Sequence, residues 1–526
     1  MTGGKPFYIT TPIYYVNDSP HLGHAYTSVA CDALARFMRL DGRNVLFLTG
    51  TDEHGQKVAK SARDAGMAPL EFCDRVSQNF RNMTKLMDIS NDQFIRTTEP
   101  RHVKASQAIW QAIAGNKSPK GRDNIYLGKY AGWYAVRDEA FYGEDELVKG
   151  ADGARRAPSG AEVEWVEEPS YFFRLSDWQD ALLAYYNAHP DFIAPKSRRN
   201  EVMSFVKGGL NDLSVSRTSF DWGVPVPGNP KHVMYVWLDA LTNYLTATGY
   251  PDTKAADYKT FWPADLHVVG KDIVRFHCVY WPAFLMAAGL EVPRRVFAHG
   301  WWTVEGQKMS KSLGNFIAPQ QLVEQYGVDA VRYFMLRELP FGADGDFSRR
   351  AVVGRINGDL ANDFGNLAQR VLSMVQSYCG GKLPEPGAFK AADENLLASA
   401  RGLLVKARVE MAEPAFHRAL ETIWQVVGAA NRYVDEQAPW TLRKTDTVRL
   451  GTVLYTLAET IRHLAILAQP FVPEAAAKLL DQLSLPPDQR DFAALATALA
   501  PGAVLPKPAG IFPRYVEAVA AGGTTT

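Results

Sequence analysis

Two histidines near the start of the chain flank a glycine in the stretch Pro20-His21-Leu22-Gly23-His24. Their imidazole N–H groups could donate hydrogen bonds to phosphate oxygens, and Gly23 leaves the backbone open to a flat base. Pro20 suits the turn just before a helix. Two other interpretations remain open for the histidine pair, a His-x-x-His metal site and ordinary side chains at a helix start. The stretch alone therefore indicates nucleotide binding as one of three alternatives.

A second stretch that could do chemistry, KMSKS, begins far downstream at Lys308. Gly306 and Gly314 flank it, so the backbone there can move. Lys308 and Lys311, together with the hydroxyl residues, would form a cationic clamp, although Lys- and Ser-rich segments are commonly solvated loops. In this order, HLGH and KMSKS resemble the two signatures of the class I aminoacyl-tRNA synthetases.

The elements around the first stretch predict how it is positioned. An apolar run at Phe7–Thr10, a helical pattern from Ala25 to Leu40 and a second apolar run at Val45–Leu48 form a βαβ order. Phosphorylated ligands bind α/β sheets where the carboxyl end of a strand leads into a helix. The sequence therefore predicts an α/β fold with a Rossmann-like, doubly wound parallel sheet that carries His21 and His24 at its binding edge.

A carboxylate follows the second of these strands, in the segment TDEHG that begins at Thr51. At the carboxyl end of a strand, Asp52 could bind an amine, and Asp52 with His54 could instead form a metal site. A third alternative is that Asp52 or Glu53 caps the helix predicted at Gln56–Asp64.

Length and composition set limits on the architecture and the compartment. The 526 residues are too many for one core and indicate about three or four domains. Lys plus Arg (57) equals Asp plus Glu (57), so a nucleic acid would have to be held by local basic patches. The long apolar segment Ile273–Leu290 contains Arg275, His277 and Pro282, which predicts a buried helix and no membrane span. The four cysteines are widely spaced and form no C-x-x-C pair, which argues against a disulfide framework and against a zinc knuckle. They favour a reducing, cytoplasmic compartment. The cysteines are Cys31, Cys73, Cys278 and Cys379.

The pattern of turns and periodic runs divides the chain into five segments. These are the first half of the catalytic sheet domain, an inserted connective subdomain, the second half of the catalytic domain, a helical bundle and a tail, at residues 1–115, 116–229, 230–347, 348–515 and 516–526. Short strands are expected in the insertion at Tyr126–Leu127 and Trp133–Val136. Helical patterns in the bundle cover Arg349–Asn357, Leu360–Tyr378, Asn395–Met411, Pro414–Gln437, Thr447–Ala468 and Pro473–Leu483.

Two helices expected in the second half of the sheet domain each carry an apolar stripe. The stripes are spaced i, i+3, i+4, i+7 in Trp237, Ala240, Leu241 and Tyr244, and i, i+4, i+8 in Ile273, His277 and Trp281. Each stripe could be ordinary helix core, or both could line one apolar pocket in which His277 is the only polar group. Such a pocket would suit a thioether, since sulfur packs well against ring edges. Between the stripes, Gly270 and Asp272 follow a strand pattern, where a carboxylate suits ribose hydroxyls.

Two features of the bundle could contact RNA. Asn362, Asn366 and Arg370 fall at i, i+4, i+8 on one helix face, where they could read base edges or be merely exposed. Trp440 belongs to a short loop expected at Pro439–Trp440. It could stack on an unpaired base or plug the core, and its apolar bulk favours the plug.

Taken in order from about residue 5 to 510, these blocks resemble the methionyl-tRNA synthetase family of class I enzymes. The similar segments are PIYYVN from Pro12, HLGH, TDEHG, YVWLDA from Tyr235, GKD from Gly270, KMSKS, the Asn362, Asn366 and Arg370 series, and APW ending at Trp440. The resemblance implies a methionine pocket, with Asp52 near the α-ammonium, made of Ile13, Tyr15, Asp52, Trp237, Ala240, Leu241, Tyr244, Ile273, His277 and Trp281. It implies ATP contacts from His21, Gly23, His24, Gly270, Asp272 and Lys311. It implies catalysis by His21, His24, Lys308 and Lys311. Recognition of the anticodon is implied for Asn362, Asn366, Arg370 and Trp440. These roles replace the core, cap and plug interpretations.

The implied activity is that of a methionine–tRNA ligase, which activates L-methionine with ATP and Mg²⁺ and charges tRNA(Met) for translation initiation and elongation. Many family members carry a zinc knuckle of paired cysteines in the insertion, whereas Tyr126–Glu146 contains none. We therefore expect no structural zinc and no protein-bound metal. The chain also stops after the bundle, without the additional RNA-binding domain of some members, which predicts a monomer.

Other classes of protein fit the sequence less well. Valyl, leucyl and isoleucyl enzymes carry a large editing insertion, for which residues 116–229 are short. A cysteinyl enzyme would use zinc thiolates, and a plain nucleotidyltransferase would not need the helical bundle. A catalytically silent RNA-binding relative is disfavoured by the intact HLGH stretch and by both lysines of KMSKS.

Overall fold

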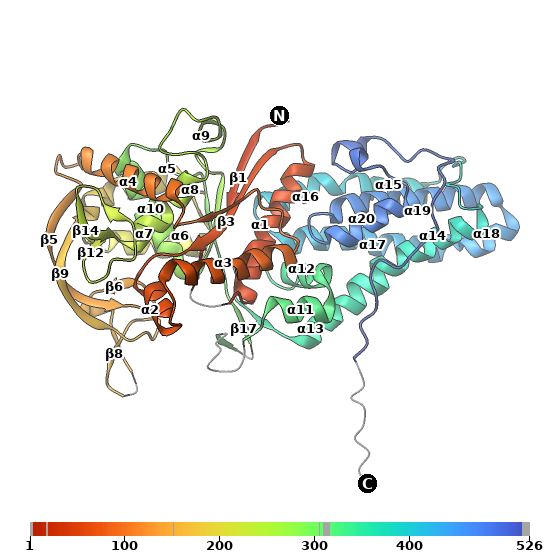
Figure 1. The fold of residues 1–526 in the computed structure, drawn as a ribbon. Coiled ribbons are helices and arrows are strands. Elements are labelled where there is room, and N and C mark those ends of the chain that lie inside the picture. The colour runs from red at the N-terminus through yellow and green to blue at the C-terminus, as the bar shows by residue number, and fades with distance from the viewer. Residues whose placement is uncertain (1–3, 17–18, 151, 305, 309–315, 518–526) are drawn as a thin grey trace, which may run out of the picture.

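The computed structural model describes residues 4–16, 19–150, 152–304, 306–308 and 316–517. The molecule is elongated, with the sheet domain and its insertion at one end and a helical bundle at the other (Figure 1). Among the described residues, no helix combines the length and apolar character needed to cross a membrane.

Seven parallel strands form the central sheet in this described part of the chain. They are β1 (Pro6–Thr10), β2 (Tyr14–Tyr15), β3 (Asn44–Asp52), β4 (Gln93–Arg96), β10 (Ile193–Ala194), β15 (Leu266–Gly270) and β16 (Val296–His299). The order is β10, β16, β15, β1, β3, β4, and β2 pairs with the end of β3 beyond the last residue of β1. Strands from the start of the chain thus lie on one side of β1 and later strands on the other. This doubly wound arrangement confirms the predicted fold class.

Helices cover both faces of the sheet, as parallel sheets require. They include α1 (Leu22–Leu40) and α3 (Pro69–Leu86) on one face and α4 (Pro100–Gly115) and α10 (Trp281–Ala288) on the other. Neighbouring strand residues point to opposite faces. Ile9 and Phe47 accordingly belong to the core beneath α1, and Tyr8 and Leu46 to the core beneath α4.

The insertion is built on a four-stranded antiparallel sheet in the order β11, β9, β5, β6. Its strands are β5 (Ile125–Ala135), β6 (Ala140–Tyr142), β9 (Glu164–Phe173) and β11 (Leu213–Ser214). The expectation of two short strands near residues 126 and 133 is wrong, because β5 is continuous and pairs with β9 even at Gly128 and Gly132. The chain returns to the central sheet at β10, well before the boundary expected at residue 229.

The C-terminal third of the chain is helical, as expected. Its elements are α13 (Arg349–Arg355), a π-helix (Ile356–Gly365), α14 (Asn366–Tyr378), α15 (Ala391–Arg401), α16 (Leu403–Ala412), α17 (Phe416–Gln437), α18 (Pro439–Thr445), α19 (Thr447–Ala468) and α20 (Pro473–Gln482). The single helix expected at Asn395–Met411 is interrupted at Gly402, and the loop expected at Pro439–Trp440 is the first turn of α18. Proline at a first helical position is compatible with helix, which explains the second error.

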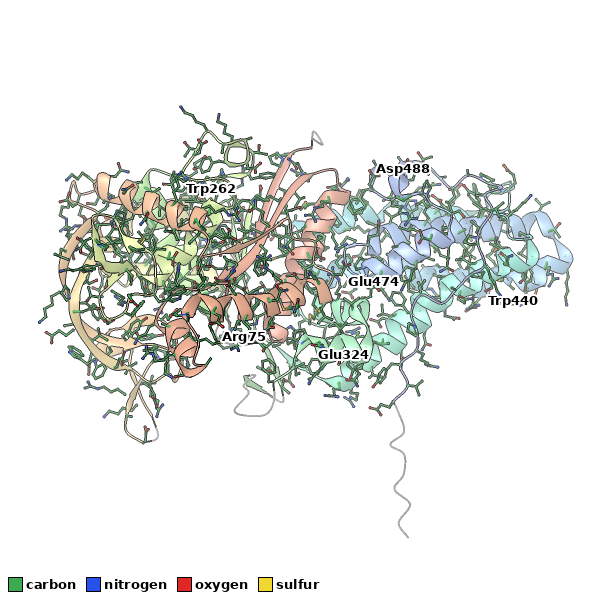
Figure 2. The ribbon with its side chains drawn as sticks, in the orientation of Figure 1. Arg75, Trp262, Glu324, Trp440, Glu474 and Asp488 are labelled. Carbon is green, nitrogen blue, oxygen red and sulfur yellow. The ribbon has the colours of Figure 1, made fainter. Side chains whose placement is uncertain are left out.

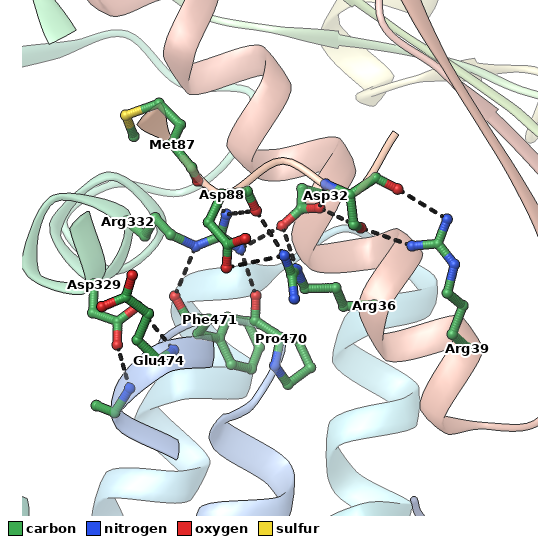
Figure 3. Close-up of polar contacts among 12 residues, drawn as sticks. Asp32, Arg36, Arg39, Met87, Asp88, Asp329, Arg332, Pro470, Phe471 and Glu474 are labelled. Carbon is green, nitrogen blue, oxygen red and sulfur yellow. Dashed lines mark hydrogen bonds and ion pairs between the residues drawn. The ribbon is translucent and has the colours of Figure 1, made fainter. Parts of the chain in front are cut away.

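A buried ion pair joins α1 to a helix that precedes the bundle (Figure 3). Arg332 of α12 (Val328–Arg337) donates to the Asp32 carboxylate at 2.6 Å, and both side chains are fully buried. Although burial opposes ionisation, Arg332 and then Arg36 hold the pKa of Asp32 below its usual value. Arg332 also donates to four backbone carbonyls, those of Met87 (3.0 Å), Asp88 (3.4 Å), Pro470 (2.9 Å) and Phe471 (3.3 Å). One guanidinium therefore joins the helix that begins with HLGH, the turn after α3 and the connection between α19 and α20.

Candidate functional site

A cavity of about 270 Å³ opens at the carboxyl ends of the central strands. Its lining includes Tyr15 after β1, Asp52 at the end of β3, Gly270 at the end of β15 and His299 at the end of β16. Strand order reverses between β1 and β15, and α/β sheets bind ligands at such a switch point.

One side of the cavity is apolar and aromatic. Nine of the ten residues predicted for methionine line it, namely Ile13, Tyr15, Asp52, Trp237, Ala240, Leu241, Tyr244, Ile273 and His277. Trp281 does not line the cavity; it is fully buried behind Tyr244, with ring centroids 6.2 Å apart. The spacing that grouped it with Ile273 assumes a regular α-helix, whereas a π-helical turn over Phe276–Tyr280 changes the register.

Two polar groups on this apolar side, His277 and Tyr244, are paired with each other, whereas the Tyr15 hydroxyl and the Trp237 indole N–H have no hydrogen-bond partner among the described residues. His277 lies with Nδ1 at 3.0 Å from the Ile273 carbonyl oxygen and Nε2 at 2.7 Å from the Tyr244 hydroxyl. Burial lowers the pKa of His277 to about 4, so the ring is neutral at physiological pH. Its Nδ1–H therefore donates to the carbonyl and Nε2 accepts from the hydroxyl. Apart from Asp52, the nine residues of this wall offer a ligand side chain polarisable rings and no charge.

Asp52 is a buried carboxyl that lacks a full set of hydrogen-bond partners. It is 2% exposed, and its Oδ1 atom has no hydrogen-bond partner among the described residues. Burial, followed by the nearby carboxylates of Glu139 and Asp239, raises the pKa of Asp52 well above its usual value. A cationic ligand group would relieve both effects.

His21 and His24 are held by each other at the amino end of α1. His21 Nδ1 accepts from the Gly23 backbone N–H at 3.0 Å, and His24 Nδ1 accepts from the His21 backbone N–H at 3.2 Å. The rings stack with centroids 3.8 Å apart. Since both Nδ1 atoms accept, the protons of the neutral rings lie on Nε2. Burial, followed by the electrostatic effect of placing a second proton on His24 beside His21, lowers the pKa of His24 well below its usual value.

Two glycines of the site permit close approach of other groups. A Cβ atom on Gly23 would lie 2.9 Å from Cε1 of His21, and one on Gly270 would lie 2.5 Å from Oδ1 of Asp272. That Oδ1 accepts from the indole N–H of Trp301 at 3.2 Å. Gly23, Gly270 and Asp272 all line the cavity together with Trp301.

Several lining residues were not found by sequence analysis. They are Pro12, Tyr14, Tyr26, Thr27, Asn243, His299, Gly300, Trp301 and Trp302. His299 ends a strand, so the rule that pointed to Asp52 could have found it. Thr27, whose hydroxyl lies 2.8 Å from Nε2 of His299, gives no comparable signal because their contact spans 272 residues.

The two predicted lysines can be described only in part. Lys308 lies in β18 (Gln307–Lys308), which pairs with β17 (Trp302–Val304) beside the cavity. Lys311 falls in 309–315, outside the described residues.

Comparisons with known proteins agree with this geometry. The family model for tRNA synthetases class I (M) matches residues 7–372. A methionine–tRNA ligase of Brucella suis biovar 1 (strain 1330) is 58% identical over 515 residues, covering 98% of this chain and 99% of the relative.

The chain belongs to the methionyl-tRNA synthetase family.

Other matches extend the family assignment to the whole length of the chain. The family model for the anticodon binding domain of methionyl tRNA ligase matches residues 383–521. A methionine–tRNA ligase of Mycobacterium bovis (strain ATCC BAA-935 / AF2122/97) is 55% identical and covers 97% of this chain and 98% of the relative. A solved Mycobacterium tuberculosis methionyl-tRNA synthetase in complex with methionyl-adenylate superposes with a TM-score of 0.94 at 55% identity, covering 97% of this chain and 100% of the other.

The residues expected to read the anticodon in this methionyl-tRNA synthetase family member lie in the bundle. Asn362 and Asn366 are exposed, and Arg370 is half-buried and pairs with Asp435 at 2.9 Å. Trp440 lies at the end of the bundle remote from the sheet domain and is 45% exposed (Figure 2). The core-plug interpretation of Trp440 is therefore wrong, and an exposed indole is free to stack.

Proposed function

We infer that the cavity at the switch point is where this protein makes methionyl-adenylate. The protein is a methionine–tRNA ligase: it activates L-methionine with ATP, releases pyrophosphate, and transfers methionine to the 3′ end of tRNA(Met). One observation supports the residue assignments that follow. The unsatisfied carboxyl of Asp52, the aromatic wall and the imidazoles of His21 and His24 line a single cavity.

Methionine would bind with its α-ammonium at Asp52 and its thioether against the wall around Tyr244. The thioether needs no hydrogen bond. The Tyr244 hydroxyl and His277 Nε2 need no hydrogen bond from the ligand, because they already bond to each other. Trp237 stacks on Phe276 with centroids 3.8 Å apart, which holds one side of the wall rigid. Trp281 would act indirectly, by supporting Tyr244.

ATP would lie across the amino end of α1, with its ribose at Asp272. The methionine carboxylate attacks the α-phosphorus, a C–O–P bond forms, and the bond to pyrophosphate breaks. No protein nucleophile is required, so catalysis rests on alignment of the reactants and on neutralising phosphate charge. His21 and His24 would donate their Nε2 protons in hydrogen bonds to the phosphates.

Additional positive charge would come from Lys308, Lys311 and Mg²⁺. Among the described residues, no three His, Cys, Asp or Glu side chains are grouped to hold a metal ion. Mg²⁺ would therefore enter on the ATP phosphates, whose charge it partly neutralises. The insertion, which has no cysteine, would need no structural zinc. The four free cysteines suit a reducing compartment such as the cytoplasm.

The proposed residue roles can be tested by amino-acid-dependent ATP–pyrophosphate exchange without tRNA, with each of the twenty amino acids in turn. Chelator-treated buffer with Mg²⁺ restored would exclude trace zinc. We expect exchange with methionine alone. Exchange with another amino acid would contradict the pocket assignment, and a requirement for zinc or tRNA would contradict the zinc-free activation site.

Replacing Trp440 by alanine should separate the two steps. The kcat/KM for tRNA charging should fall about 10- to 100-fold, because loss of one base-stacking contact is worth roughly that factor. Pyrophosphate exchange without tRNA should stay unchanged, since Trp440 is remote from the cavity. Phe389→Ala is a matched control, because Phe389 is a 37% exposed aromatic in the bundle outside the predicted anticodon set. Equal losses in both reactions would show that Trp440 serves the fold.

A further inference from the structure

A second buried carboxylate lies behind the methionine side of the cavity and is held by two histidines. Asp239 is 1% exposed, and its Oδ2 lies 2.6 Å from Nδ1 of His54. Its Oδ1 lies 2.7 Å from Nε2 of His102 and 3.4 Å from the Ser106 hydroxyl. None of these four side chains lines the cavity.

Asp239 and the two histidines belong to three separate elements, which their hydrogen bonds connect. His54 follows β3 and stands two residues after Asp52. Asp239 belongs to α7 (Val236–Leu241), between Trp237 and Ala240, and His102 belongs to α4. The contacts thus join the segment that carries the predicted ammonium partner to the helix that carries the apolar wall.

Helix α7 depends on such contacts because it is very short. It has only six residues, and no side chain caps its amino end. Helices of this length are not stable without tertiary contacts. The apolar side chains of α7 pack without directional bonds, whereas the Asp239 bonds fix both a distance and an orientation.

Charge gives these bonds additional strength. Burial opposes ionisation of Asp239, but the His54 imidazole and then His102 hold its pKa below the usual value, so Asp239 is an anion. A hydrogen bond to a buried anion is stronger than one between neutral groups. The direct N–H···O distances also leave no room for a metal ion between the carboxylate and either ring.

We propose that Asp239, with His54 and His102, is a positioning unit that sets the distance between Asp52 and the Trp237–Ala240 wall, and thereby the affinity for methionine. This inference rests on the proposed assignment of the cavity to methionine. Asp239 itself touches no substrate.

The first test is Asp239→Asn, studied by pyrophosphate exchange in the full-length protein. The KM for methionine should rise about 10- to 100-fold, the range expected when a hydrogen bond to a charged group is lost. The KM for ATP and kcat should change less than about threefold, because the α1 histidines are not attached to this unit. A matched control is Asp393→Asn, which neutralises an equally buried carboxylate of the bundle that pairs with Arg449. The control should lower thermal stability without changing the KM for methionine.

Two variants of His54 keep the test informative if Asp239→Asn folds poorly. His54→Ala removes the donor, whereas His54→Asn places an amide N–H near the position of Nδ1. We expect the KM for methionine to rise in the alanine variant and to return most of the way in the asparagine variant. Equal effects of the two variants, or parallel losses in both KM values and kcat, would overturn the proposal.

Asp52→Asn distinguishes failure of this inference from failure of the cavity assignment. If Asp52→Asn raises the KM for methionine and Asp239→Asn does not, the positioning unit is wrong and the cavity assignment stands. If neither changes the KM, methionine does not bind in this cavity.

Discussion

Replacement of Asp52 by asparagine should raise the KM for methionine about 100- to 1000-fold in pyrophosphate exchange, the loss expected for a buried charge pair. Asparagine has nearly the same shape but cannot pair with the α-ammonium as an anion. The kcat at saturating methionine should change far less, since Asp52 makes no contact with the phosphates in the proposed arrangement. Initial rates across a methionine titration at saturating ATP give both constants.

The adjacent residue provides a matched control for Asp52. Glu53 is also fully buried, but its carboxylate is already bonded to Arg96 at 2.7 Å and to the Thr51 hydroxyl at 2.8 Å. Glu53→Gln should therefore affect stability more than the KM for methionine. A KM change in Glu53→Gln as large as that in Asp52→Asn would mean that loss of any buried charge disrupts the pocket.

The pH dependence of methionine binding gives a second readout of the same variant. Burial, with Glu139 and Asp239 adding to it, raises the pKa of Asp52, so the carboxyl is protonated in the ligand-free protein below that pKa. Only the ionised form pairs with an ammonium. The KM for methionine should therefore fall as pH rises towards this pKa, and Asp52→Asn should remove that dependence. Because burial also raises the pKa of Glu139 to about 7, Glu139→Gln is needed to separate the two carboxyls.

Replacement of Arg332 by methionine should destabilise the protein by about 3–5 kcal/mol, since it leaves the buried Asp32 carboxylate without its cation. Four backbone carbonyls would each lose a hydrogen bond from Arg332 as well. The destabilisation should lower the urea concentration at the midpoint of the unfolding transition that includes α1. Hydrogen exchange of the α1 backbone amides measures that transition.

An arginine of the bundle makes a suitable control for Arg332. Arg408 of α16 pairs with Asp41 just after α1, but its side chain is 49% exposed. Arg408→Met should cost less than about 1 kcal/mol, because exposed ion pairs contribute little. The double variant Asp32→Asn, Arg332→Met should be less damaged than Arg332→Met alone, since it removes the unpaired charge. Similar midpoints for Arg332→Met and Arg408→Met would contradict this account.

The sequence was sufficient to predict much of the fold. The doubly wound sheet follows from apolar runs that alternate with a helical period, and the bundle follows from long amphipathic patterns. Strand β10 could not be predicted, because two residues carry no periodic signal. The unbroken β5 was missed because glycine usually interrupts strand patterns, whereas here β9 supplies partners along its length.

The site was predictable where chemistry coincides with a strand end or a helix face. Asp52, Gly270 and Asp272 satisfy the first condition and Trp237 the second. Glu139, whose charge affects Asp52, satisfies neither: it comes from the turn between β5 and β6 of the insertion, and its Oε1 lies 3.4 Å from the Lys57 backbone nitrogen in the helix that follows β3. Only the folded arrangement of that turn against this helix could indicate the contact. The roles of the predicted residues in binding methionine, ATP and tRNA stay predictions.

The ion pair between Asp32 and Arg332 also has a consequence for how the protein is made. The partners are 300 residues apart, and the ribosome adds about 5–20 residues per second, so their synthesis is separated by roughly 15–60 s. Throughout that interval the HLGH helix has a carboxylate whose buried counter-ion does not yet exist. The helix therefore cannot take its final place while the N-terminal half is emerging. Half-made chains should expose the apolar face of this helix to chaperones, and the activation site should form only after α12 has been made.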